Sequence, residues 1–326
     1  MKKSLRLLAL FLAGLLLLCG CAKKESYAIR VGSRSISEQA FARQAATLSN
    51  YLAEMEGDLS DPEEFEGYVC DYLINLKLYA QKFEDLGLSF NEEEEEKIDS
   101  YLSEVIAGYE SISVFQQALA EAGYTYDEYL EELYDHEKKN KVLNYYYGPE
   151  GQEPVAVQDL KDYYALHNAV IKYVVISTVD EHGEPLEQEQ QAEAKKAAED
   201  AFHEATRQEK EDHFDEVIEL YSEDNSTRFE PAVISDANMG KDSLSEKVMA
   251  MKVGQVILAE MDEGYMVIKR YDATAEEHFT KEVQQSVLEE YRAEEIEELL
   301  ATWRENTAIK INQKVIQKYQ IKSAAS

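Results

Sequence analysis

Apolar positions recur at intervals of three and four residues through the first part of the chain. The clearest series follows Pro62 and comprises Phe65, Val69, Tyr72, Leu73, Leu76, Tyr79, Ala80 and Phe83. Because residues at this spacing share one face of a helix, the series predicts an amphipathic helix. The dipeptide Leu86-Gly87 is a typical C-terminal stop for that helix.

Three further positions carry residue types that begin helices. Ser35 or Ser37 follows a short apolar strand at 28–31, and Asn91 and Thr125 each stand three residues before a glutamate. A side-chain oxygen at such a position accepts a hydrogen bond from the first helical turn, and the glutamate completes a capping box. This first part of the chain is therefore predicted to be mainly helical.

The pattern changes after 147–154, a segment that contains two glycines and two prolines and is predicted to be a linker. Beyond it, continuous apolar runs typical of strands alternate with helical periodicity. The predicted helices lie at 157–166, 188–208, 214–221, 244–251 and 276–306, and the predicted strands at 170–176, 256–259, 265–269 and, in the tail, 309–312. Together with the helical first part, this order predicts an α+β fold.

The N-terminus has the pattern of an export signal. Basic residues at 2–6 precede an apolar run at 7–18, which has about a dozen residues where a membrane span needs roughly 20. The sequence Leu18-Cys19-Gly20-Cys21 then resembles the lipobox of bacterial lipoproteins, which implies cleavage before Cys21 and lipidation of its thiol. An ordinary secretory signal and a short N-terminal anchor are the alternatives. The predicted location is the outer face of the bacterial cell membrane, through this lipid anchor.

Composition narrows the range of partners. The chain has 326 residues and a formal net charge of −33, which would repel phosphate groups. Nucleic acid is therefore excluded as a partner, and anionic lipid would be repelled too, which leaves the acyl anchor for membrane attachment. Cleavage before Cys21 leaves only Cys70 besides the anchor, so no intramolecular disulfide is expected, and Cys70 is predicted to be a buried thiol.

The acidic run Glu92–Glu96 is the most conspicuous candidate for metal binding. Acidic side chains in a first helical turn are favoured by the helix dipole alone, so the run predicts a helix start rather than a metal site. The six histidines form no HExxH motif, and the chain contains neither GxSxG nor a phosphate-binding glycine loop. No metal and no cofactor are predicted.

The order of elements resembles the SurA/PrsA class of extracytoplasmic foldases, which combine a helical chaperone region with a parvulin-type prolyl isomerase domain. The segments that carry the resemblance are 31–41, 73–78 and 86–88 in the first part, and 214–224, 251–256 and 264–269 in the second. The resemblance implies five regions. They are a lipoprotein signal at 1–20, a SurA-like helical domain at 21–147, a linker at 148–154, a parvulin-like domain at 155–273, and a C-terminal helix and tail at 274–326 that pack on the chaperone region.

The resemblance also assigns the positions of a parvulin catalytic site, and most of them are replaced. The family's two histidines fall on Tyr173 and Met266, its Cys or Asp on Asn225 with Asp224 adjacent, its Ser on Glu263, and its proline pocket on Leu244 and Met239. Parvulins form no covalent intermediate and lower a barrier of roughly 18–20 kcal/mol by favouring the twisted amide. Tyrosine can still donate a hydrogen bond, whereas methionine cannot.

These replacements predict a chaperone that binds unfolded exported polypeptides, with weak or no prolyl isomerase activity. A fully active isomerase is the first alternative. A solute-binding lipoprotein of a transporter is the second, although that class needs two α/β lobes with several parallel strands, more strands than the pattern provides. A helical region of this type could also form a homodimer, but no apolar stripe in the sequence requires one.

Overall fold

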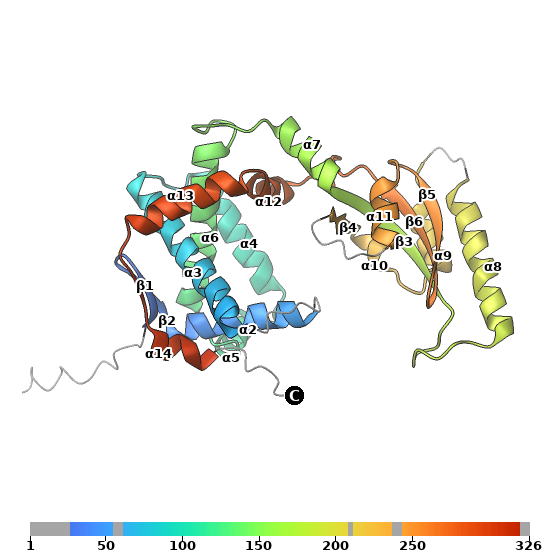
Figure 1. The fold of residues 1–326 in the computed structure, drawn as a ribbon, viewed down its shortest axis with the longest axis horizontal. Helices are drawn as coiled ribbons and strands as arrows, with labels where there is room; N and C mark the ends of the chain where they lie inside the picture. The colour runs from blue at the N-terminus through green and yellow to red at the C-terminus, as the bar shows by residue number, and fades with distance from the viewer. Residues whose placement is uncertain (1–26, 55–60, 208–210, 237–242, 320–326) are drawn as a thin grey trace, which may run out of the picture. The chain divides into compact units, whose positions relative to one another are not determined.

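A computed structural model of the protein describes residues 27–54, 61–207, 211–236 and 243–319 (Figure 1). The described residues form two compact units. Unit 1 contains those up to Tyr146 and from Glu294 onward, and unit 2 those from Tyr147 to Ala293. The predicted lipidation site Cys21 and the predicted pocket residue Met239 lie outside the described residues.

Unit 1 is built mainly of helices. They are α2 (Glu38–Glu54), α3 (Pro62–Asp85), α4 (Glu92–Ala107), α5 (Ile112–Glu121), α6 (Tyr126–Tyr147), α13 (Ala293–Glu305), α14 (Gln313–Ile316) and the 3-10 turn η2 (Gln317–Tyr319). All three predicted starts are confirmed: Ser37 Oγ accepts from Ala40 N at 3.0 Å, and Asn91 and Thr125 form reciprocal capping boxes with their glutamates. Gly87, with a φ of +64°, follows the end of α3 as predicted.

A three-stranded antiparallel sheet in the order β2-β1-β7 joins both ends of the described chain in unit 1. Its strands are β1 (Tyr27–Val31), β2 (Arg34–Ser37) and β7 (Ile309–Ile311). The first and last strands were predicted. The sequence did not predict β2, because its alternating serines match the pattern of a helix cap equally well.

The core of unit 1 packs this sheet against α2, α3 and α14. Its fully buried members include Ile29, Phe41 and Ile316, and Trp303 of α13 packs against the same cluster. Cys70 is buried in this core as predicted, and burial, with the nearby charges of Glu66 and Asp71, raises the pKa of its thiol to about 12.

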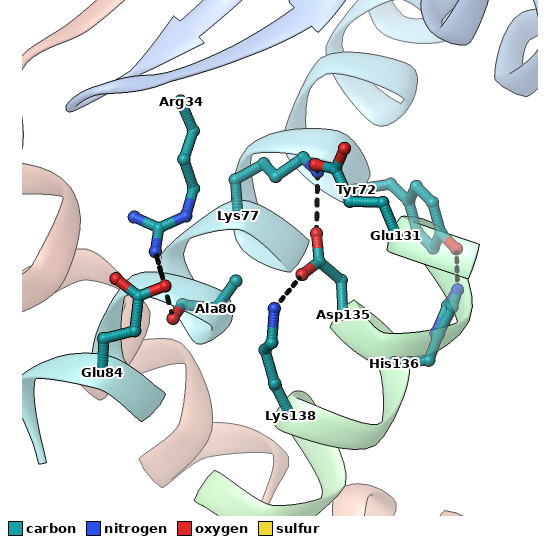
Figure 2. Close-up of polar contacts among 9 residues, drawn as sticks. All are labelled: Arg34, Tyr72, Lys77, Ala80, Glu84, Glu131, Asp135, His136 and Lys138. Atoms are coloured by element: carbon teal, nitrogen blue, oxygen red, sulfur yellow. Dashed lines mark hydrogen bonds and ion pairs between the residues drawn. The ribbon is translucent and has the colours of Figure 1, made fainter. Parts of the chain in front are cut away.

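A buried ion pair links α3 to α6 (Figure 2). The carboxylate of Asp135, which is 2% exposed, accepts from Lys77 Nζ at 2.7 Å and from Lys138 Nζ at 3.0 Å. Next to it, the Tyr72 hydroxyl lies 3.1 Å from His136 Nε2, and burial lowers the pKa of His136. The Lys77–Asp135 pair that joins the two helices is therefore largely withdrawn from water.

Unit 2 has a four-stranded antiparallel sheet in the order β4-β3-β6-β5. Its elements are α7 (Val157–His167), β3 (Asn168–Ser177), α8 (Gln188–Ala205), α9 (Phe214–Tyr221), α10 (Ser226–Phe229), β4 (Ala232–Ser235), α11 (Ser243–Ala250), β5 (Val256–Met261), β6 (Gly264–Tyr271) and α12 (Lys281–Tyr291). The strands β3, β5 and β6 were predicted. The short strand β4 was not, because the sequence around it has no alternation.

The predicted single helix at 276–306 is wrong. Thr280 caps α12 by accepting from Val283 N, and Arg292 leaves the helical conformation with a φ of −111° and a ψ of 22° before α13 begins. The break coincides with the boundary between the two units. Helix-forming residues continue through it, so local sequence gives no sign that the helix ends there.

The strand pairings of the described residues are all antiparallel. A solute-binding protein with two parallel-stranded lobes therefore does not describe these two units. Within the ranges that the structure describes, no helix is both long and apolar enough to cross a membrane.

Candidate functional site

The sheet of unit 2 has two apolar faces, because successive side chains of a strand point to opposite sides. On one side Val174, Ile176 and Val267 pack against α8 and α9. On the other side Ile171 and Ile268 pack against α11, which contributes Val248. The second face contains the positions that the sequence singled out.

Three of the predicted site residues belong to one cluster on this second face. Tyr173, Leu244 and Met266 are all partly buried and pack against its buried members. Tyr173 is paired with Ile268, and Met266 with Val175, on the neighbouring strands β3 and β6. The two positions assigned to histidines by the resemblance are thus diagonal neighbours on one face, about 7 Å apart by the usual sheet spacing.

The segment after α9 completes the edge of β3. Strand β4 pairs with only the first four residues of β3, so the backbone beyond Ile171 needs other partners. Val175 N donates to Ser222 Oγ at 2.9 Å, and Glu223 N donates to the Val175 carbonyl at 2.9 Å. Thr227 Oγ accepts from Tyr173 N at 3.1 Å. Short polar side chains therefore fix this segment beside Tyr173.

The Tyr173 hydroxyl donates to the Asp224 carboxylate at 3.2 Å. Ser226 N donates to the other oxygen of the same carboxylate at 2.8 Å. Hydrogen bonds from the backbone and side chain of Ser226, with a smaller contribution from Tyr173, lower the pKa of Asp224. The carboxylate is consequently ionised near neutral pH and acts only as an acceptor. This pair orients the tyrosine hydroxyl toward the edge of the sheet.

Two other predicted residues are not part of the cluster. Asn225 occupies an exposed position at the start of α10, and Glu263 is exposed in the turn between β5 and β6. The backbone carbonyl of Glu263 accepts from Thr178 N at 2.8 Å and from Ser177 Oγ at 3.4 Å. The group that meets Tyr173 is Asp224, the residue before the aligned position. Its spacing from Ser226 is typical of a side-chain turn and could have indicated it.

Histidines of unit 2 make other contacts. His167 Nδ1 lies 2.7 Å from the Asp236 carboxylate, while His213 and His278 lie 2.9 Å from the backbone carbonyls of Glu204 and Asp272. The cluster that contains Tyr173 and Met266 includes no imidazole among the residues described. In the described part of the chain, no three His, Cys, Asp or Glu side chains are arranged to hold a metal ion.

Large apolar side chains also remain exposed on unit 2. Phe229 is 80% exposed, and Val253, Met261 and Leu258 are exposed to smaller extents. Such side chains can bind apolar segments of another polypeptide.

Comparison with known protein families found a match in the first part of the chain. Residues 4–142 match a protein family described as the SurA-like N-terminal domain. The first part of this chain is therefore similar to SurA-like N-terminal domains. This confirms the resemblance of the helical region to the SurA/PrsA class, while the parvulin-like character of 155–273 stays a prediction.

Three solved structures are similar over 88–90% of this chain. PrsA of Bacillus subtilis is 15% identical, with 90% of this chain and 98% of that chain covered and a TM-score of 0.32. The foldase protein PrsA of Streptococcus pneumoniae is 12% identical, with coverages of 90% and 97% and a TM-score of 0.34. A structure described under the SurA-like chaperones PEB4 and Cj1289 of Campylobacter jejuni is 14% identical, with coverages of 88% and 99% and a TM-score of 0.31. No curated protein matches the chain.

Proposed function

We propose that this SurA-like protein is an exported chaperone that binds unfolded polypeptides and has little or no prolyl isomerase activity. The SurA-like match of residues 4–142 supports the chaperone role. The leader and Cys21 support tethering to the outer face of the membrane, where exported chains emerge unfolded.

The proposed loss of catalysis rests on one observation. It is the composition of the second face of the unit 2 sheet, which contains Tyr173 and Met266. Met266 has no hydrogen-bond donor, and the Tyr173 hydroxyl is engaged by Asp224. Isomerisation requires stabilisation of a twisted amide against a barrier of roughly 18–20 kcal/mol. A face with this composition can hold an apolar peptide but offers no preorganised donor directed at the amide.

Exposed apolar and aromatic side chains in both units support the binding role. Examples are Tyr101 at 52% and Ile112 at 50% exposure in unit 1, and Phe229 at 80% in unit 2. Unfolded chains expose the complementary apolar groups, so contact with these side chains removes both surfaces from water.

An aggregation assay tests the chaperone role. The mature chain without its lipidated cysteine, from residue 22 onward, is added to a reduced, unfolded client, and light scattering is followed at increasing ratios. Suppression at near-stoichiometric ratio is expected. Absence of suppression, together with thermal stabilisation by a small metabolite, would instead indicate a solute-binding protein.

A protease-coupled assay on a proline peptide tests the second part of the proposal. Turnover is expected to stay close to the uncatalysed rate and to be unchanged in Leu244→Ala. Turnover near that of an active parvulin, and lost in Leu244→Ala or Asn225→Ala, would contradict the proposed loss of catalysis while leaving the chaperone role intact.

A further inference from the structure

Unit 1 presents a group of exposed aromatic and aliphatic side chains on α4, on α5 and on the connection between them. Tyr101 and Tyr109, here named the aromatic face, are 52% and 39% exposed, and Ile112 and Val114 at the start of α5 are 50% and 39% exposed. Exposed apolar groups that lie together mark interaction surfaces more often than single ones do.

The aromatic face is supported from below by a fixed ring cluster. Buried Phe115 contacts the rings of Tyr109 and Tyr129 at centroid distances of 5.2 and 5.5 Å. Burial and a hydrogen bond with Tyr101 raise the pKa of Tyr129, which places Tyr101 on the same cluster. These contacts hold the exposed rings in defined positions, so a partner loses little side-chain entropy in binding them.

The stretch of sequence that contains the aromatic face is strongly acidic. Lys97 is the only lysine or arginine between Asn91 and Glu137, although this stretch is rich in Asp and Glu. Glu104 lies one helical turn after Tyr101, and Glu110 directly follows Tyr109; both glutamates are exposed. A segment bound here would therefore meet aromatic rings and carboxylates together.

One arginine of the chain already lies over a tyrosine ring in this region. The Arg43 guanidinium lies 3.7 Å from the centroid of the Tyr124 ring and donates to the Gly123 carbonyl at 2.5 Å. Tyr124 is in turn an edge-on neighbour of Tyr129 at 6.1 Å. The ring cluster beneath the aromatic face thus holds a cation over a tyrosine, the geometry in which the ring quadrupole attracts positive charge.

We propose that the aromatic face binds unfolded polypeptide segments in which lysine or arginine stands next to an apolar side chain. The inference rests on the proposed chaperone function and specifies which clients unit 1 prefers. Charge complementarity selects this occupant, because an acidic segment would be repelled by the neighbouring carboxylates and a purely apolar one would gain no attraction from them.

The test uses fluorescence anisotropy with the mature chain and three labelled, unstructured peptides. In these peptides Phe alternates with Lys, Gln or Glu between Gly-Ser spacers. The Lys peptide is expected to bind about tenfold more tightly than the Glu peptide at low salt, with the difference shrinking as salt is added. Equal affinities for the Lys and Glu peptides would overturn the charge preference.

Substitutions of exposed tyrosines test where the Lys peptide binds. Tyr101→Ala with Tyr109→Ala is expected to weaken Lys-peptide binding about fivefold, whereas Tyr291→Ala, which removes a ring of matching 38% exposure in unit 2, should leave it unchanged. Both tyrosines are exposed, and circular dichroism checks that the variants stay folded. Equal loss in the two variants would overturn the assignment to the aromatic face.

Two double variants with the same change in net charge distinguish a local electrostatic effect from an effect of the net charge of the protein. Glu104→Gln with Glu110→Gln should weaken the Lys peptide about threefold, while the exposed pair Glu189→Gln with Glu193→Gln on α8 changes net charge equally and should have little effect. Equal effects would contradict a local site. If aggregation of a client is still suppressed in that case, the proposed function stands and only the client preference fails.

Discussion

Gly264, the first residue of β6, shows how one position can depend on the backbone of a neighbouring strand. Its φ is +152°, and a Cβ atom there would lie 2.2 Å from the Ile176 carbonyl oxygen and 3.0 Å from the Ser177 Cα. Both of these are backbone atoms of β3, the strand paired with β6. Only glycine allows this close approach.

Gly264→Ala is expected to destabilise unit 2 by about 3 kcal/mol, because strain and a backbone clash combine. Gly183→Ala is the matched control, since Gly183 has a φ of +78° with nothing within 4 Å of the added carbon, and it should cost about 1 kcal/mol. Hydrogen exchange of β3 and β6 peptides measures both. A smaller effect for Gly264 than for Gly183 would show that the strands separate at little cost.

Asp135 illustrates the opposite kind of residue, a charge buried between two lysines. Asp135→Asn is expected to lower the free energy of unfolding of unit 1 by about 3 kcal/mol, because Lys77 and Lys138 lose their shared carboxylate. Glu93→Gln removes one partner of an exposed pair with Lys97 and should change the free energy of unfolding by less than about 0.5 kcal/mol. Urea unfolding followed by the fluorescence of Trp303, the single tryptophan, reports both.

The ion pair between Lys77 and Asp135 also makes the stability of the fold depend on pH in the alkaline range. Burial by itself would lower the pKa of Lys77, but Asp135 and Glu131 raise the net value above its ordinary one. A raised folded pKa contributes stability that is complete below the unfolded pKa of about 10.4 and is lost as pH rises through the folded value. Wild-type stability should therefore fall above about pH 10 more steeply than that of Asp135→Asn. Parallel curves would rule out this linkage.

At the scale of elements, the local signals for helices were reliable, and those for short strands and helix ends were not. The caps at Ser37, Asn91 and Thr125 act within four residues, so the sequence contains all of their partners. The strands β2 and β4 each have four residues and depend on a longer neighbour for pairing. The end of α12 at Arg292 depends on the boundary between units.

The C-terminal elements complete the core of unit 1. Strand β7 pairs with β1, and Ile316 of α14 is 0% exposed in the same core as Ile29. Ile316→Ala should lower the free energy of unfolding by about 3 kcal/mol through the lost apolar contacts and the cavity left. Ile311→Ala on β7, where the side chain is 40% exposed, should cost less than about 1 kcal/mol.

Trp303 fluorescence during urea unfolding compares these two variants. Its ring packs against the same core, so the transition reports unit 1. An effect of Ile316→Ala as small as that expected for Ile311→Ala would mean that α14 is not needed for the stability of that core.

At the scale of the whole molecule, the proposed function depends on where the chain is held. Cys21→Ala is expected to move the protein from the membrane fraction to the soluble one and to abolish incorporation of a labelled fatty acid, because the proposed acyl chains would provide the attachment. Cys19→Ala is the matched control and should change neither. Membrane retention of Cys21→Ala would indicate an uncleaved anchor instead.

The sequence alone determined the α+β class, most helices, the buried state of Cys70, and the order of elements that resembles the SurA/PrsA class. These features follow from periodicity and capping, which act over a few residues. It also selected Tyr173, Leu244 and Met266, but it could not show that they share one face. Strand register decided that, together with the contact between Tyr173 and Asp224.

The pairing that joins the two ends of the described chain in unit 1 was likewise decided by tertiary structure. The sequence had predicted only that the tail contains a strand. Pairing between β1 and β7 links residues about 280 positions apart, and the choice of such partners depends on which packing buries the most apolar surface rather than on local preference. The aromatic face arises in the same way. Its tyrosines are visible in the sequence, but only packing around Phe115 determines that they stay exposed together.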